Sequence, residues 1–178
     1  MTSMQTRVVW AVLAVAFAAA SCTPVLDWRE VRPGGARLAA LFPCRPELQV
    51  RRLPLAGTVV EMSLWACSAG GATYAVGFAD VGEPHRVALA LDELAASAAR
   101  NIRSTGTPGT VPLRVAGMTP NPRAKRQTLA GQLADGQRVQ EQMAVFVRGA
   151  RVYQATMVGA RLDDEAVEMF FGALRLPT

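Results

Sequence analysis

The sequence predicts an α+β fold in which a central antiparallel sheet is covered on both faces. Three observations predict it. The periodic segments run in the order strands, helix, strands, helix, which is typical of antiparallel sheets with segregated helices. Short turns, most of which contain glycine, separate neighbouring strands, as in β-hairpins. Two central strands are apolar on both sides, which indicates a sheet that is covered on both faces.

Two short strands are predicted to precede the main run of hairpins. Residues 26–32 alternate imperfectly between apolar and polar side chains, which favours an edge strand. Residues 37–42 follow after a Pro-Gly-Gly turn and are predicted to form a second strand. This strand stops at Pro43, which has no backbone N–H to donate to a ladder.

The next predicted element is a hairpin whose turn is the Ala-Gly dipeptide at 56–57. It joins residues 47–55 to residues 58–67, and the two-residue turn pairs Leu55 with Thr58 and so fixes the register of the two strands. Followed along the strands, this register places Cys67 next to the segment that holds Cys44.

The Gly-Gly dipeptide at 70–71 predicts a second turn, which pairs Cys67 with Tyr74 and Trp65 with Val76. One face of this strand pair then carries mostly bulky side chains: Trp65, Cys67, Tyr74, Val76 and Phe78. The other face carries mostly small ones: Met62, Leu64, Ala66, Ala75, Gly77 and Ala79. Both faces are apolar, so both are predicted to be covered.

A helix is predicted over residues 84–103. Pro84 suits a first helical turn. Apolar residues recur at helical spacing over the segment: Val87, Leu91, Leu94, Ala95, Ala98 and Ile102. His85, the one histidine of the chain, falls at the start of this helix and is predicted to be solvated.

The second half is predicted to be strands followed by a terminal helix. The strands are residues 111–118, 127–133, 138–148 and 151–160. Asp135-Gly136 is a typical hairpin turn, and the turn at 149–150 pairs Val147 with Val152. The acidic residues 163–165 provide a cap and an acidic first turn for the final helix.

The first 21 residues are predicted to be a signal peptide that is removed. Arg7 is followed by an apolar run over residues 8–20, which is shorter than the roughly 20 residues that a bilayer-spanning helix requires. The run ends in small residues before Cys22, which resembles a bacterial lipobox, although Ala19 stands where leucine is commonest. We expect Cys22 to be lipidated, so that residues 22–36 hold the anchor, tether and edge strand and residues 37–178 form one domain. The alternative is an ordinary signal peptide cut after Ala20.

The remaining cysteines, Cys44 and Cys67, are predicted to form a disulfide because an exported chain folds in an oxidising compartment. No set of residues with metal-ligand spacing accompanies them, so neither a metal nor a cofactor is predicted. The formal net charge is +5, and the basic residues are scattered except around residues 123–126. Nucleic acid is therefore not an expected partner.

Four short motifs resemble a class of small uncharacterised bacterial lipoproteins: residues 41–46, 72–76, 151–155 and 170–176. Their layout is similar to the sandwich of the PsbP-type proteins. The resemblance implies an α/β/α sandwich, in which helices flank the central antiparallel sheet on both faces. It also implies a binding or assembly-assisting role, and it brings no catalytic residues.

No catalytic motif is present, and no enzymatic activity is predicted. Glu61, Asp80 and Glu141 are expected at solvent-facing strand positions. The predicted function is a lipid-anchored binding or assembly module of the bacterial cell envelope, facing the periplasm, with an unknown envelope protein as partner. Thr23 follows the cysteine where lipoproteins retained in the inner membrane of enteric bacteria have aspartate, and this difference from their pattern favours the outer membrane. A carrier of a small apolar ligand between sheet and helix is the alternative, and an enzyme of unrecognised type is a third reading.

Trp28, Trp65 and Tyr153 are candidates to line a ligand cleft, although Trp65 is better explained as a core residue.

Overall fold

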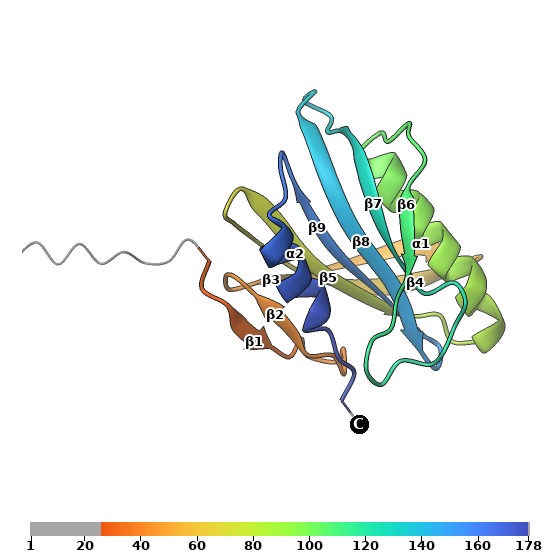
Figure 1. Cartoon of the computed structure of the whole chain (residues 1–178). Coiled ribbons are helices and arrows are strands. Elements are labelled where there is room, and N and C mark those ends of the chain that lie inside the picture. Colours follow the sequence, from red (N-terminus) through yellow and green to blue (C-terminus); the bar gives the residue numbers. More distant parts are fainter. Residues whose placement is uncertain (1–25, 178) are drawn as a thin grey trace, which may run out of the picture.

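The computed structural model describes residues 26–177 (Figure 1). The elements in chain order are β1 (Arg29–Val31), β2 (Ala40–Phe42), β3 (Glu47–Leu55), β4 (Thr58–Ala69), β5 (Ala72–Asp80), a 3₁₀ turn η1 (Pro84–Arg86), α1 (Val87–Asn101), β6 (Gly109–Pro112), β7 (Lys125–Gln132), β8 (Arg138–Arg148), β9 (Arg151–Gly159) and α2 (Asp164–Gly172). The predicted signal peptide and Cys22 lie outside the described residues.

The predicted sandwich with helices on both faces is wrong. Strands make up 47% of the described residues and helices 18%. Seven antiparallel strands form one sheet in the order β3-β4-β5-β9-β8-β7-β6, and β1 and β2 form a separate small sheet. The described chain has two α-helices, and the one of nine residues shares its face of the sheet with β1, β2 and irregular segments. The fold is therefore mostly β.

One face of the large sheet packs against α1 (Figure 1). The helix buries an apolar stripe that includes Leu91, Leu94 and Ala98. It contacts β8 and β9 and leaves the β3 side of the same face without a helix above it. The core on this face also includes Leu55 and Val60 of the β3–β4 hairpin, so it extends beyond the two strands that the helix contacts most.

The opposite face is filled by aromatic side chains. Phe170 of α2 lies edge-on to Phe42 of β2 and to Tyr74 of β5, with ring centroids 5.7 and 5.4 Å apart. Phe146 of β8 stacks on Tyr153 of β9. Segments that are distant in sequence meet here, because β1, β2, α2 and the chain end all cover this face.

The hairpin registers predicted from the turns are confirmed. Leu55 pairs with Thr58, Cys67 with Tyr74, and Trp65 with Val76. Val147 pairs with Val152 across the turn between β8 and β9. The division of β4 and β5 into two faces is also as predicted: Tyr74 and Val76 belong to the aromatic core and Ala79 to the core beneath α1.

Other predicted elements are shorter or displaced. The strand expected over 37–42 is β2 alone, and the one expected over 111–118 is β6, Gly109–Pro112. After Pro112 the chain leaves the sheet. Val115 is buried in the aromatic core, and Ala116 forms an isolated bridge to Arg175.

The predicted helix over 84–103 divides into η1 and α1, so that α1 begins at Val87. The terminal helix has the predicted cap, since Asp163 accepts a hydrogen bond from the Ala166 backbone N at 2.9 Å.

Candidate ligand-binding groove

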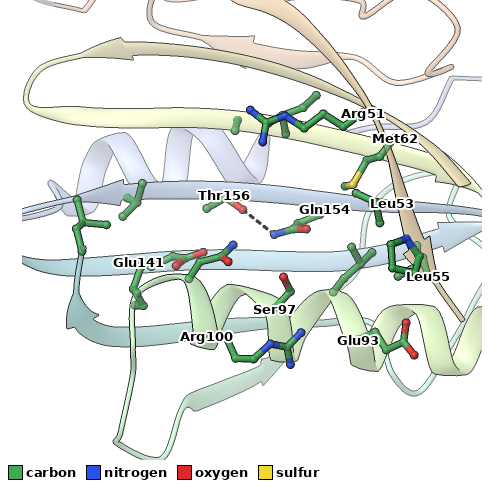
Figure 2. Close-up of a pocket in the computed structure, with 18 residues that line it drawn as sticks. Arg51, Leu53, Leu55, Met62, Glu93, Ser97, Arg100, Glu141, Gln154 and Thr156 are labelled. Carbon is green, nitrogen blue, oxygen red and sulfur yellow. Dashed lines mark hydrogen bonds between the residues drawn. The ribbon is translucent and has the colours of Figure 1, made fainter. Parts of the chain in front are cut away.

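A groove of about 680 Å³ lies between α1 and the sheet (Figure 2). Side chains from β3, β4, β5, β8, β9 and α1 line it. Its apolar lining includes Leu53, Leu55, Met62, Leu64, Leu94, Ile102, Leu133 and Val158. Its polar lining is Arg51, Glu93, Ser97, Arg100, Asn101, Glu141, Gln154 and Thr156. The groove is thus a mainly apolar hollow with several polar groups.

Small residues on the sheet make this hollow. Ala75 lies on its floor, and Gly77 follows two residues later on the same face of β5. A Cβ atom at Gly77 would lie 2.7 Å from Met62 Cε and 3.2 Å from Leu64 Cδ1, so these two side chains fold over the glycine. The small-residue face predicted for β4 and β5 therefore becomes groove floor where α1 does not reach it.

A hydrogen bond beside the groove joins α1 to the β3–β4 turn. The Glu93 Oε2 atom on α1 accepts from the Ala56 backbone N at 2.7 Å. Ala56 is in the β3–β4 turn and has a left-handed φ of 50°. The Glu93 carboxylate therefore ties the helix to the hairpin and is already occupied by a donor.

Glu141 is the buried acid of the groove. Its position on β8 is 4% exposed, and its register neighbours on β7 and β9 are Leu129 and Val158. Burial among these apolar groups raises the pKa of Glu141 to about 7, because desolvation disfavours the carboxylate. Within residues 26–177 its carboxyl makes no side-chain hydrogen bond or ion pair. The prediction that Glu141 faces solvent is wrong.

The sequence holds a signal for this burial in the alternation of strand β8. Strand side chains alternate between faces, and Glu141 stands between Val139 and Met143 on the face that packs toward α1. Glu61 and Asp80, for which the same solvent-facing position was predicted, are exposed as expected.

The remaining polar groups of the groove have different surroundings. Gln154 Nε2 donates to Thr156 Oγ1 at 3.3 Å on the floor. Ser97 extends from α1 toward the strands (Figure 2). Arg51 and Arg100 are exposed, so their guanidinium groups are hydrated at the rim.

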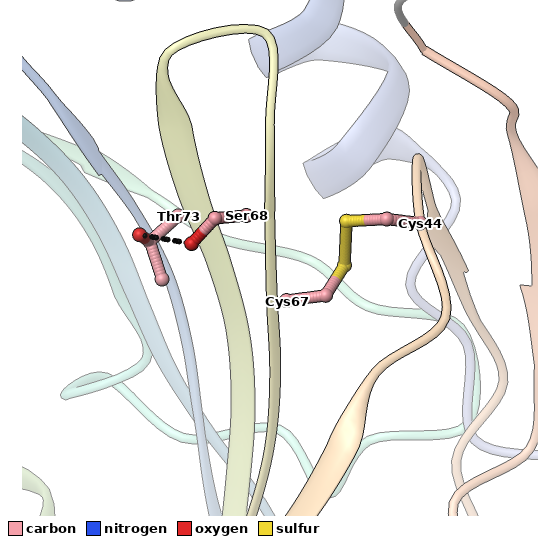
Figure 3. Close-up of a disulfide and its surroundings, with 4 residues drawn as sticks. All are labelled: Cys44, Cys67, Ser68 and Thr73. Carbon is pink, nitrogen blue, oxygen red and sulfur yellow. Dashed lines mark hydrogen bonds between the residues drawn. A yellow bond between two sulfur atoms is a disulfide. The ribbon is translucent and has the colours of Figure 1, made fainter.

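Cys44 and Cys67 form the predicted disulfide, with Cα atoms 6.0 Å apart (Figure 3). It joins the segment between β2 and β3 to strand β4. The bond lies on the aromatic side of the sheet, where Cys67 packs beside the core, and it is separate from the groove.

The aromatic residues suggested as cleft lining are found on the other face. Trp28 lies edge-on to Tyr74 at 5.7 Å between centroids, and Tyr153 is buried with its hydroxyl donating to Ala36 O at 2.8 Å. Trp65 packs against the same core. None of the three lines the groove.

His85 is exposed as predicted, with Nδ1 3.1 Å from a Glu83 carboxylate oxygen. Among residues 26–177, no three His, Cys, Asp or Glu side chains gather as a metal site would require. In the same range no helix combines the length and apolar character needed to cross a membrane. Comparison with protein-family models and with curated proteins finds no match to this chain. The groove is therefore interpreted from its own residues.

Proposed function

We propose that this chain is a lipid-anchored module of the bacterial cell envelope, facing the periplasm, that binds a small, largely apolar ligand in the groove between α1 and the sheet. The observation that carries the ligand-binding part is the groove itself. Its volume of about 680 Å³ lies in the range of small-molecule sites, and apolar walls with a few polar groups are typical of such sites.

The lipid anchor is proposed from the predicted signal peptide and from the three cysteines. The Cys44–Cys67 disulfide accounts for two of the three cysteines, so it does not compete with acylation of Cys22. Diacyl attachment with an added N-acyl chain would hold the domain stably, because two or more chains are needed for lasting attachment. An anchored carrier would take up or release its ligand close to a membrane surface.

Ligand binding is tested with the full chain and the neutral apolar fluorophore N-phenyl-1-naphthylamine. We expect saturable binding with one site per chain. Ser97→Phe fills the groove from α1 and should abolish this binding. Ala96→Phe, the neighbouring and exposed position, is the matched control and should keep it. Binding that is absent from the wild type, or that persists in Ser97→Phe, would rule out the groove as a ligand site.

Anchoring is tested by mass spectrometry of the mature N-terminus with and without reduction. A lipid mass on Cys22 together with an intact Cys44–Cys67 bond is expected. An unmodified Cys22, or Cys22 in a mixed disulfide, would contradict the anchor.

A second candidate function, assembly with an envelope protein, is favoured by the edge strand β3. Leu48 and Val50 are 49% and 50% exposed on this strand, and its outer edge has no neighbouring strand within the described chain. An exposed edge can accept a strand from a partner. A photo-crosslinker at Val50 should give one defined adduct in cells, whereas one at exposed Thr105 should give none. Equal labelling from both positions would contradict this candidate.

A further inference from the structure

The carboxyl of Glu141 lies in the groove with no partner from the described chain. It comes from the centre of a sheet, where β7 and β9 flank β8 with apolar side chains at the paired positions, Leu129 and Val158. The side chain lines the groove, so a molecule that enters would meet it (Figure 2). A buried carboxylate is unfavourable unless a hydrogen-bond donor or a cation compensates its desolvation.

The other charged groups around the groove do not provide that compensation. Glu93 of α1 carries the same sign and accepts from Ala56 N. Arg51 of β3 donates to Gln49 Oε1 at 3.3 Å, and it is exposed. Arg100 of α1 is also exposed, and neither arginine forms an ion pair with Glu141. Within the described residues, therefore, no cation is paired with this carboxyl, and the two arginines of the groove stand exposed at its rim.

We infer that Glu141 receives the protonated amino group of a ligand whose apolar body lies along the groove. This inference rests on the proposed ligand-binding function and specifies its ligand class, hydrophobic amines. A charge-assisted hydrogen bond between an ammonium group and a carboxylate is among the stronger polar contacts, and it gains strength in an apolar surrounding. The aliphatic walls, including Leu64, Leu94 and Val158, would cover the apolar body.

Affinity for such an amine should depend on pH. The carboxylate is the form that pairs with an ammonium group, and burial raises the pKa of Glu141 to about 7. The ionised fraction of such a group rises about tenfold between pH 6 and pH 8. A primary alkylamine stays protonated over this interval because its pKa is close to that of lysine, about 10.4. Binding should therefore tighten as pH rises and should release protons from the protein at pH 6.

The test is calorimetric titration of the full chain with three soluble probes of equal length: 4-phenylbutylamine, 4-phenyl-1-butanol and 4-phenylbutyrate. We expect the amine to bind at least tenfold more tightly than the alcohol and the acid at pH 8, and about tenfold more tightly at pH 8 than at pH 6. Glu141→Gln should remove both the preference and the pH dependence. Glu61→Gln, which neutralises an exposed carboxyl on the neighbouring hairpin, is the matched control and should change neither.

The outcomes separate the two proposals. If the alcohol binds the wild type as well as the amine does, or if Glu141→Gln keeps the amine preference, the inference is wrong and the groove remains a ligand site. If none of the probes binds, the ligand-binding function fails and the inference fails with it. Proton release, measured on the wild type in two buffers of different ionisation enthalpy, tests Glu141 even if the variant folds poorly. Its absence at pH 6 would overturn the inference.

Discussion

Glu93 on α1 accepts a hydrogen bond from the backbone N–H of Ala56, with 2.7 Å between Glu93 Oε2 and Ala56 N. The two residues are 37 positions apart, with Glu93 in the groove lining and Ala56 in the β3–β4 turn beside it. Ala56 is buried and has a left-handed backbone, so its N–H is fixed in direction and partly shielded from water. This bond holds the helix at a defined place beside the β3–β4 hairpin.

Glu93→Ala should lower the free energy of unfolding by about 1–3 kcal/mol, because the Ala56 N–H loses its acceptor in a part-buried site. Glu93→Gln keeps an oxygen acceptor, so its free energy of unfolding should fall by less. The measurement is urea denaturation, with the midpoints compared at equal slope. Equal losses in the two variants, or no loss in Glu93→Ala, would show that the bond does not stabilise the helix.

Glu141→Gln should change how stability depends on pH. The pKa of Glu141 is about 7 in the folded chain against the ordinary 4.5, so between these values the folded state binds more protons than the unfolded state. Glu141 therefore makes its full contribution to the free energy of unfolding below about pH 4.5. This contribution is lost as the pH rises to about 7. The Glu141→Gln side chain does not titrate, so the variant does not lose stability in this way as the pH rises.

The expected difference between Glu141→Gln and wild type is close to zero near pH 4. At pH 8 the variant should be the more stable by up to the order of 3 kcal/mol. Denaturant unfolding across this pH range measures the difference, with the exposed Glu61→Gln as control. A difference that is the same at both ends of the range would argue against a buried carboxyl.

Removal of the Cys44–Cys67 bond should cost roughly 3 kcal/mol of stability, since the cross-link restricts the unfolded chain over a separation of 23 residues. The double variant Cys44→Ala/Cys67→Ala measures this by urea denaturation. Reductant should lower the stability of the wild type by a similar amount and leave the double variant unchanged. If reductant lowered the stability of both proteins, its effect would not come from the Cys44–Cys67 bond.

Gly131→Ala should destabilise the fold by about 1–3 kcal/mol through overpacking. A Cβ atom at Gly131 in β7 would lie 2.0 Å from the Ile102 carbonyl O, which is backbone and has little room to move. Gly106→Ala is the control, because no atom lies within 4 Å of its added Cβ. Thermal or urea unfolding distinguishes them, and equal effects would contradict the close approach between β7 and the end of α1.

The hairpins of this protein could be predicted because local chemistry determines them. Two-residue turns fix the register, and a shift by one residue would move every apolar side chain to the wrong face. The pairs Cys67–Tyr74 and Val147–Val152 follow from the turn positions alone. The disulfide could be predicted for the same reason, since the register brings Cys67 next to the segment that holds Cys44.

The covering layers could not be predicted in this way. Apolar residues on both faces of β4 and β5 indicate that each face is buried, but the same pattern results whether a helix, a strand pair or a loop covers it. Helices were expected on both faces, and one face is closed by β1, β2, the short α2 and loops together. Val115, for example, was expected in a strand of the sheet but lies beyond the end of β6, buried in the aromatic core.

By itself, the sequence determined the strands of the hairpins, their registers, the capped terminal helix and the cysteine pair, because each depends on residues that are close in the chain or joined by a tight turn. Only the tertiary structure decided where α1 lies over its face of the sheet, and that a groove with Glu141 in its lining stays open between them. The physical reason is that a groove is the space left between elements. Its existence depends on where α1 lies over the sheet, and the Glu93–Ala56 contact that holds α1 there joins residues 37 positions apart.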